Sequence, residues 1–161
     1  MSGNDGCLGA DLFARLRPRL AVGATFLVYD RDSGRTPTTK RRPVVIVGGL
    51  PPTDEPAEIT RGRVVRVLTR VSWKPHFGPP PTSEAENLQL LRDRKIVFTP
   101  AGVLPGLDLD GAFEFRIVRP LAVIVLADAP FLGWLPRPYI EVLALHATGA
   151  RPADPYPPEG A

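Results

Sequence analysis

The chain has 161 residues, of which 43% are hydrophobic and 23% charged, and its formal net charge at pH 7 is +3. This length predicts one domain with a sizeable core, and 20 prolines favour short elements and loops over a helical bundle. The single Cys7 excludes an internal disulfide, and only two histidines argue against structural zinc. No secretory segment or apolar run of membrane-spanning length is present. We therefore expect a cytoplasmic protein that binds no membrane, metal or cofactor.

The first part of the chain predicts a helix and two strands. Asp11 can cap a short helix that ends at Pro18. Residues 23–30, GATFLVYD, alternate across the two faces of a strand. A polar loop at residues 31–41 precedes a second strand at Pro43–Val47. Because its four successive β-branched residues are not interrupted by polar ones, we expect both faces of that strand to be buried.

The central part predicts a third strand and an interruption. Residues 61–73 alternate regularly, which places Arg66 and Arg70 on one face of the third strand. Residues 74–87 are rich in proline and break the regular structure. A capping box at Ser83–Glu86 predicts a short helix directly afterwards.

The last part predicts three further strands and a closing helix. Strands are expected at residues 95–99, 111–118 and 121–126, the last of them apolar and buried. Residues 137–149 predict a helix that begins with a proline and stops at a glycine. The proline-rich residues 150–161 predict a disordered tail.

This order of elements favours a mainly β protein with few helices, namely a small SH3-like antiparallel β-barrel with a C-terminal helix. The predicted parts are an N-terminal helical extension at 1–22, a barrel domain at 23–149 with a proline-rich insertion at 74–87, and the tail at 150–161.

Positive charge is concentrated in two segments, residues 31–45 and 61–76. Together they carry about +9, which is typical of a face that binds a polyanion such as RNA. The alternative is that these cations only protect strand edges from pairing.

The chain also resembles the PemK/MazF family of type II toxins. The resemblance rests on Gly23 opening a strand, Arg42-Pro43 leading into an apolar strand, VRVLTRVS ending the third strand, and the segments GLDLDGAFEF and FLGWLPRPYIEVLAL. It implies a homodimeric barrel that cleaves single-stranded RNA, such as mRNA, with sequence selectivity and without a metal, and that a cognate antitoxin protein neutralises. It maps the catalytic pair onto Arg42 and Thr69.

The chemistry of those residue types fits such a reaction. When the 2′-hydroxyl of RNA attacks the adjacent phosphate, negative charge grows on the phosphoryl oxygens and protons move at both ends. The arginine fork can hold two phosphate oxygens, and a threonine hydroxyl can donate one more hydrogen bond. Arginine is a poor base, so His76 is a candidate to abstract a proton. The alternative is that His76 is an ordinary loop residue.

Further residues are candidates for contacting RNA rather than reacting with it. These are Lys40, Arg41, Arg66, Arg70, Trp73 and Lys74. Trp73 could stack on a base, although core or dimer packing is an equal alternative. Because the insertion follows Thr69 so closely, a noncatalytic SH3-like module that binds nucleic acid or protein through the Arg66 and Arg70 face stays open. A toxin of the same fold that poisons a topoisomerase is a further alternative.

Overall fold

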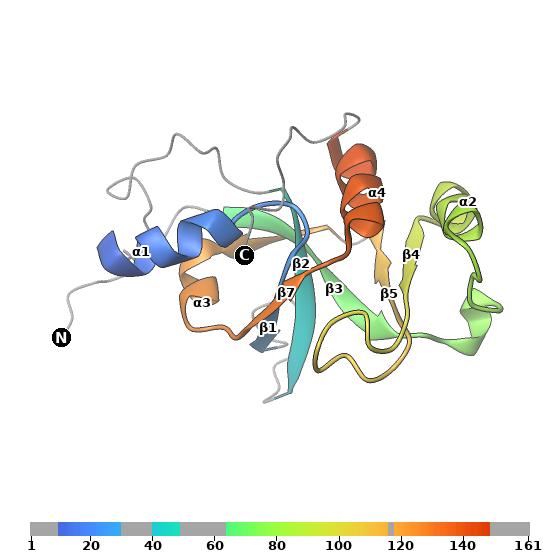
Figure 1. Ribbon diagram of the computed structural model, residues 1–161, viewed down its shortest axis with the longest axis horizontal. Helices are drawn as coiled ribbons and strands as arrows, with labels where there is room; N and C mark the ends of the chain where they lie inside the picture. The colour runs from blue at the N-terminus through green and yellow to red at the C-terminus, as the bar shows by residue number, and fades with distance from the viewer. Residues whose placement is uncertain (1–9, 30–39, 49–63, 116–117, 149–161) are drawn as a thin grey trace.

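The computed structural model describes residues 10–29, 40–48, 64–115 and 118–148 (Figure 1). Its helices and strands, in chain order, are α1 (Ala10–Leu16), β1 (Ala24–Tyr29), β2 (Arg41–Gly48), β3 (Val64–Ser72), α2 (Glu84–Arg94), β4 (Ile96–Thr99), β5 (Gly111–Glu114), β6 (Arg119–Ala122), α3 (Val123–Ala127), β7 (Phe131–Trp134) and α4 (Arg137–Thr148). Short 3₁₀ turns occupy Arg17–Arg19 and Pro75–Phe77.

The strands form one curled antiparallel sheet in the order β4-β5-β3-β2-β1-β7, and β6 also pairs with β3. β3 is the central strand: one edge pairs with β2, whereas the other pairs with β6 along its first half and with β5 along its last residues. The sheet therefore bends around β3 (Figure 1). The prediction of a mainly β fold with a small antiparallel barrel and a C-terminal helix is confirmed.

The core lies on both faces of this sheet. In β2, Val44 and Ile46 join a cluster with α1 and α3, while Val45 and Val47 join a cluster with α2 and α4. All four side chains are at most 2% exposed, which confirms the prediction that both faces of β2 are covered. Burying a side chain of this size contributes about 1.5–3 kcal/mol, so β2 anchors the sheet.

Gly23 shows why a glycine opens the first strand. Its φ is +97°, a conformation that side chains disfavour, and a Cβ there would lie 2.5 Å from Cγ1 of Ile140 in α4. Ile140 is completely buried. Gly23 therefore lets the closing helix pack directly against the start of β1.

The predicted helix after the insertion is confirmed as α2. Ser83 is its N-cap and its Oγ accepts a hydrogen bond from the Glu86 backbone N–H at 3.2 Å. The Glu86 carboxylate accepts from the backbone N–H and the hydroxyl of Thr82 rather than from the N-cap N–H, and these bonds lower the Glu86 pKa. The local cap signal was thus sufficient to predict where α2 begins.

Two elements differ from the prediction. The apolar segment Leu121–Leu126 was expected to be a strand, but only its first two residues belong to β6, and Val123–Ala127 form α3. Val123 and Leu126, three residues apart, face one cluster shared with α1 and β1, so tertiary packing overrides the β propensity of this run. The prediction also missed β7, which pairs with β1 through a bulge and contains Gly133 at φ +129°.

Some predictions lie outside the described residues, namely the tail at 150–161 and most of the polar loop predicted at 31–41, of which Arg41 belongs to β2. Among the helices of the described segments, none has the length and apolarity needed to cross a membrane. Within the same segments, no group of three or more His, Cys, Asp or Glu side chains is arranged to hold a metal ion.

Candidate nucleic-acid interface

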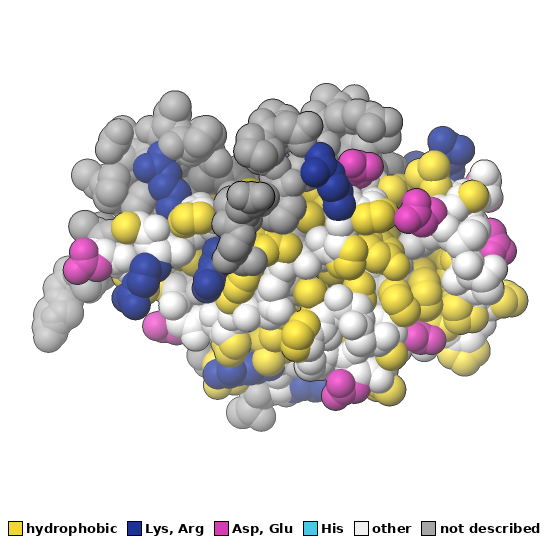
Figure 2. Space-filling model, viewed as in Figure 1, with side chains coloured by type: hydrophobic (Ala, Val, Ile, Leu, Met, Phe, Trp, Pro, Cys, Tyr) yellow, Lys and Arg dark blue, Asp and Glu magenta, His cyan; other side chains and the backbone are white. Residues whose placement is uncertain are grey.

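Three consecutive cations stand at the start of β2, where it pairs with the end of β1. Arg41 is opposite Tyr29 and Arg42 is opposite Val28, while Lys40 directly precedes the strand. Lys40 and Arg41 are exposed, and Arg42 is partly exposed. This end of the sheet lies at the lower edge of Figure 1, and Lys and Arg side chains lie along the same edge in Figure 2. We call Lys40, Arg41 and Arg42 the basic end.

Arg41 is held in place by the aromatic residue opposite it. Its guanidinium carbon lies 4.8 Å from the centroid of the Tyr29 ring, and Nη2 donates a hydrogen bond of 3.3 Å to the Tyr29 hydroxyl. A guanidinium stacked on an aromatic ring is a flat surface of the kind that nucleobases stack on. The sequence analysis did not single out Tyr29, although an aromatic residue ending a strand before a basic loop was a visible signal.

The strand register places the predicted catalytic pair on the same face of neighbouring strands. Val44 of β2 is paired with Thr69 of β3, and paired residues of antiparallel strands point to the same face. Arg42 lies two residues before Val44 and so shares that face. Diagonal neighbours of this kind are about 7–8 Å apart at the backbone, which is within reach of an arginine side chain.

The Thr69 hydroxyl is unusual within the described part of the protein. Its Oγ1 is buried and has no hydrogen-bond partner there. Buried polar atoms are nearly always bonded, because an unsatisfied one costs about 1–3 kcal/mol. Either this hydroxyl stays unsatisfied at a cost in stability and is retained for function, or it forms a hydrogen bond to a group that binds at this site.

Arg70 does not lie where the prediction placed it. Its side chain is only 6% exposed. Nε donates to Thr99 Oγ1 at 2.8 Å, and Nη2 donates to the backbone oxygens of Thr99 at 3.0 Å and Leu109 at 2.7 Å. Burial lowers the pKa of the guanidinium, and the nearby Asp110 carboxylate opposes that shift. Arg70 therefore belongs to the interior and not to the predicted RNA-contacting surface.

Arg66 is exposed, but it lies away from the basic end. It is paired with Gly48 at the end of β2, whereas Arg42 is near the beginning. Six strand residues separate the two pairing positions, which corresponds to about 20 Å. Arg66 therefore lies at the opposite end of β2 from Lys40 and Arg41.

Trp73 is engaged inside the protein. Its ring packs edge-on against Phe77 and Phe98, and its indole N–H donates to the Gly78 carbonyl at 2.9 Å. These contacts favour the alternative that Trp73 packs within the protein rather than stacking on a base.

His76 and Lys74 are both exposed in that turn. The His76 ring lies against Phe77, with centroids 4.6 Å apart, and its backbone oxygen accepts a hydrogen bond from Arg94. The described contacts of His76 are with these residues rather than with Arg42 or Thr69. Its role as a base stays a prediction.

Comparison with models of known protein families finds no match, and comparison with curated proteins finds no relative. The likeness to PemK/MazF toxins therefore remains a prediction drawn from short motifs.

Proposed function

We propose that this protein binds single-stranded RNA at the basic end and cleaves it without a metal, as the toxin of a type II toxin–antitoxin system. The observation that carries the proposal is the register of β2 against β3. That register puts Arg42 and Thr69 on neighbouring strands and on the same face. The proposal gives the unbonded Thr69 hydroxyl a partner, namely an oxygen of the reacting phosphate.

In this proposal the two residues act on the phosphate rather than on the base. Arg42 holds two phosphoryl oxygens and stabilises the charge that grows as the 2′-hydroxyl attacks. Thr69 donates a further hydrogen bond to the same group. Lys40 attracts the polyanion from a distance, and Arg41 with Tyr29 presents a surface for a neighbouring base.

The test is cleavage of long single-stranded RNA by the purified protein in EDTA. We expect products with cyclic phosphate ends, and we expect Arg42→Ala and Thr69→Val each to lower the rate at least about 100-fold, as removal of one stabilising donor does. Thr69→Val keeps the shape of the side chain and removes only the hydroxyl. Arg66→Ala is the matched control, because it removes an exposed arginine from the same sheet away from the basic end.

A second candidate function is favoured by the burial of Thr69 Oγ1. A hydroxyl that solvent does not reach cannot touch RNA unless the covering groups move, so a noncatalytic module that binds RNA through Lys40, Arg41 and Arg42 is the alternative. Under it, the intact protein leaves RNA uncut, binding weakens steeply with salt, and Arg42→Ala reduces the salt slope by about one. Thr69→Val then leaves binding unchanged.

The proposal also includes a homodimer and a cognate antitoxin. Light scattering of the purified protein measures the first. The second predicts that expression of the protein alone stops growth of a bacterial host, that Arg42→Ala relieves the arrest, and that a co-expressed antitoxin restores growth. Growth unaffected by well-expressed, folded protein would contradict the toxin assignment.

A further inference from the structure

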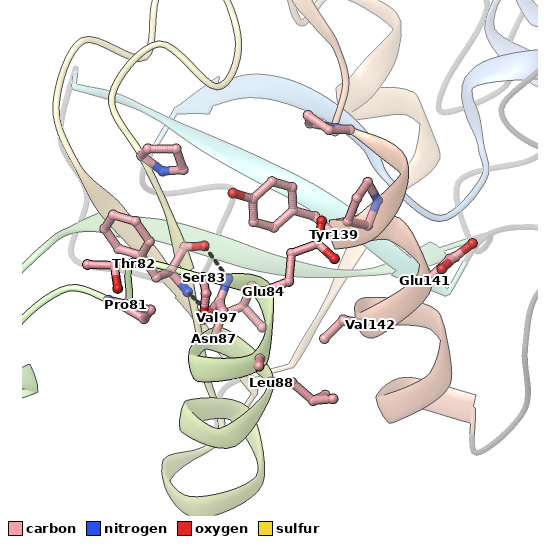
Figure 3. A pocket seen from close by; sticks show the side chains of 15 residues that line it. Pro81, Thr82, Ser83, Glu84, Asn87, Leu88, Val97, Tyr139, Glu141 and Val142 are labelled. Carbon is pink, nitrogen blue, oxygen red and sulfur yellow. Dashed lines mark hydrogen bonds between the residues drawn. The ribbon is translucent and has the colours of Figure 1, made fainter.

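One groove in the described part of the protein lies away from the basic end. It has a volume of about 830 Å³ and lies between α2 and α4, above β4 (Figure 3). Its accessible apolar lining includes Leu88, Val142 and four prolines, whereas Val97 and Phe98 are buried at its base. In the space-filling view, hydrophobic side chains gather in this region between α4 and α2, and Asp and Glu side chains surround them (Figure 2). Ligand sites have this size and this mostly apolar lining.

The charges of the groove have one sign. Among the residues that line it, the ionisable carboxylates are Glu84 and Glu141, and none of the lining residues is Lys or Arg. Glu141 pairs with Arg137 one turn earlier in α4, at 3.4 Å, so part of its charge is compensated. Glu84 extends from the first turn of α2 toward Tyr139 on α4, whereas Glu141 points away (Figure 3). Glu84 is therefore the charge that faces an occupant.

Tyr139 lies within the field of the same carboxylate. Its hydroxyl has a raised pKa, first because the group is partly buried and second because Glu84 carries a negative charge nearby. An aromatic ring next to a carboxylate is an arrangement that favours a cation, through charge pairing and through attraction to the ring face.

The polar edge of β4 is already occupied. The Asn87 side chain donates to the Phe98 backbone oxygen at 3.0 Å and accepts from the Phe98 N–H at 2.9 Å. These two hydrogen bonds to the backbone of Phe98 protect the strand edge at that position. An occupant of the groove is thus recognised by its side chains and not by adding a strand to the sheet.

From these observations we infer that the groove is a docking site for a peptide segment of a partner protein that combines apolar residues with a lysine or arginine. The apolar side chains of the peptide lie on Leu88 and Val142, and the cation lies between Glu84 and the ring of Tyr139. Charge complementarity selects this class of partner, because an acidic segment would meet the Glu84 carboxylate and no Lys or Arg among the lining residues. The groove is chemically opposite to the basic end and does not depend on RNA cleavage.

The experiment begins with random peptides displayed on phage and selected on the immobilised full chain. We expect the selected peptides to carry a lysine or arginine beside apolar residues. The best arginine peptide is then synthesised with a fluorescent label, together with an analogue in which citrulline replaces arginine. Citrulline keeps the shape and removes the charge, so we expect about tenfold weaker binding by fluorescence anisotropy, in line with a hydrogen bond to a charged group.

Variants of the protein assign the effect to the groove. Glu84→Gln should remove the difference between the arginine and citrulline peptides, and Val142→Lys should weaken the arginine peptide more than about tenfold by placing a like charge in the groove. Asp128→Asn is the control for net charge, because Asp128 is exposed at the end of α3. Arg42→Ala should bind the peptide normally, which separates this site from RNA binding. Circular dichroism checks that each variant is folded.

Four results would overturn the inference. Selection of acidic or uncharged peptides, or of no peptide at all, would show that the groove does not select a cation. Equal binding of the citrulline analogue would identify a neutral apolar occupant. An arginine preference that persists in Glu84→Gln would place the binding elsewhere. A dimer that Val142→Lys dissociates would show that the occupant is a second copy of this chain.

Discussion

Each half of β3 carries one arginine, and the two side chains differ in their exposure to solvent. In the first half, which pairs with β6, Arg66 is exposed. In the second half, which pairs with β5, Arg70 is buried and bonded to Thr99 and Leu109. Both residues lie in the same strand, and their positions, four residues apart, put them on the same face. The difference in exposure therefore comes from the elements that cover each half of β3. A cluster of cations in a sequence can therefore contain structural arginines as well as ligand-binding ones.

The largest change in stability is expected when the buried arginine, Arg70, is replaced. Arg70→Met should lower the free energy of unfolding by about 3 kcal/mol, because three buried acceptor sites on Thr99 and Leu109 lose their charged donor. Urea denaturation measures the change. Arg66→Met, on the exposed half, should change it by no more than about 0.5 kcal/mol. Equal losses in the two variants would refute the division of β3 into a structural and an exposed half.

A pair of glycines beside the two arginines sharpens the contrast. A Cβ at Gly111 would lie 2.5 Å from the guanidinium carbon of Arg70 and 2.7 Å from the backbone oxygen of Val71. Neither neighbour is free to move, so Gly111→Ala should cost about 2 kcal/mol by overpacking.

Gly48→Ala is the matched change on the exposed half. There a Cβ would lie 3.2 Å from Cβ of Arg66, a contact that a small shift relieves, and the reduced freedom of the unfolded chain offsets part of the cost. We expect a loss below about 1 kcal/mol by the same urea measurement. A larger loss at Gly48 than at Gly111 would show that the crowded side of β3 has been misassigned.

An effect of the opposite sign is expected in the middle of the strand, at Thr69. Thr69→Val removes a buried hydroxyl that has no partner within the described residues, so the variant should be more stable by about 1 kcal/mol. Stability and RNA cleavage are measured on the same sample. A gain in stability with a loss of cleavage is the result expected of a hydroxyl kept for chemistry. A loss of stability would mean that the hydroxyl has a partner outside the described segments.

Much of the fold could be predicted because its signals are local. The alternation of β1, the β-branched run of β2 and the cap of α2 at Ser83 are each written within about ten residues. The prediction of a strand at 121–126 was wrong because these apolar residues suit either a strand or a buried helix. Packing against α1 and β1 favours the helix α3. β7 was not predicted because Gly133 and a bulge obscure the alternation that marks a strand.

The candidate site was predictable in part, for the same reason. That Arg42 stands at the mouth of a buried strand follows from its neighbours in sequence. Whether Thr69 lies on the same face as Arg42 depends on the register between β2 and β3, which are far apart in the sequence. A shift of that register by one residue would put Arg42 and Thr69 on opposite faces. Nothing in the local sequence separates Arg70 from Arg66.

The amino-acid sequence by itself determined the class of fold, the principal strands, the capped helix α2 and the position of the cations along the chain, because hydrophobic periodicity and cap chemistry act over a few residues. Only the tertiary structure decided which cations face solvent, which hydroxyl is left without a partner, and where a groove opens. These properties arise from contacts between distant segments: β4 and β5 bury Arg70, β2 brings Arg42 beside Thr69, and α4 meets α2 over β4.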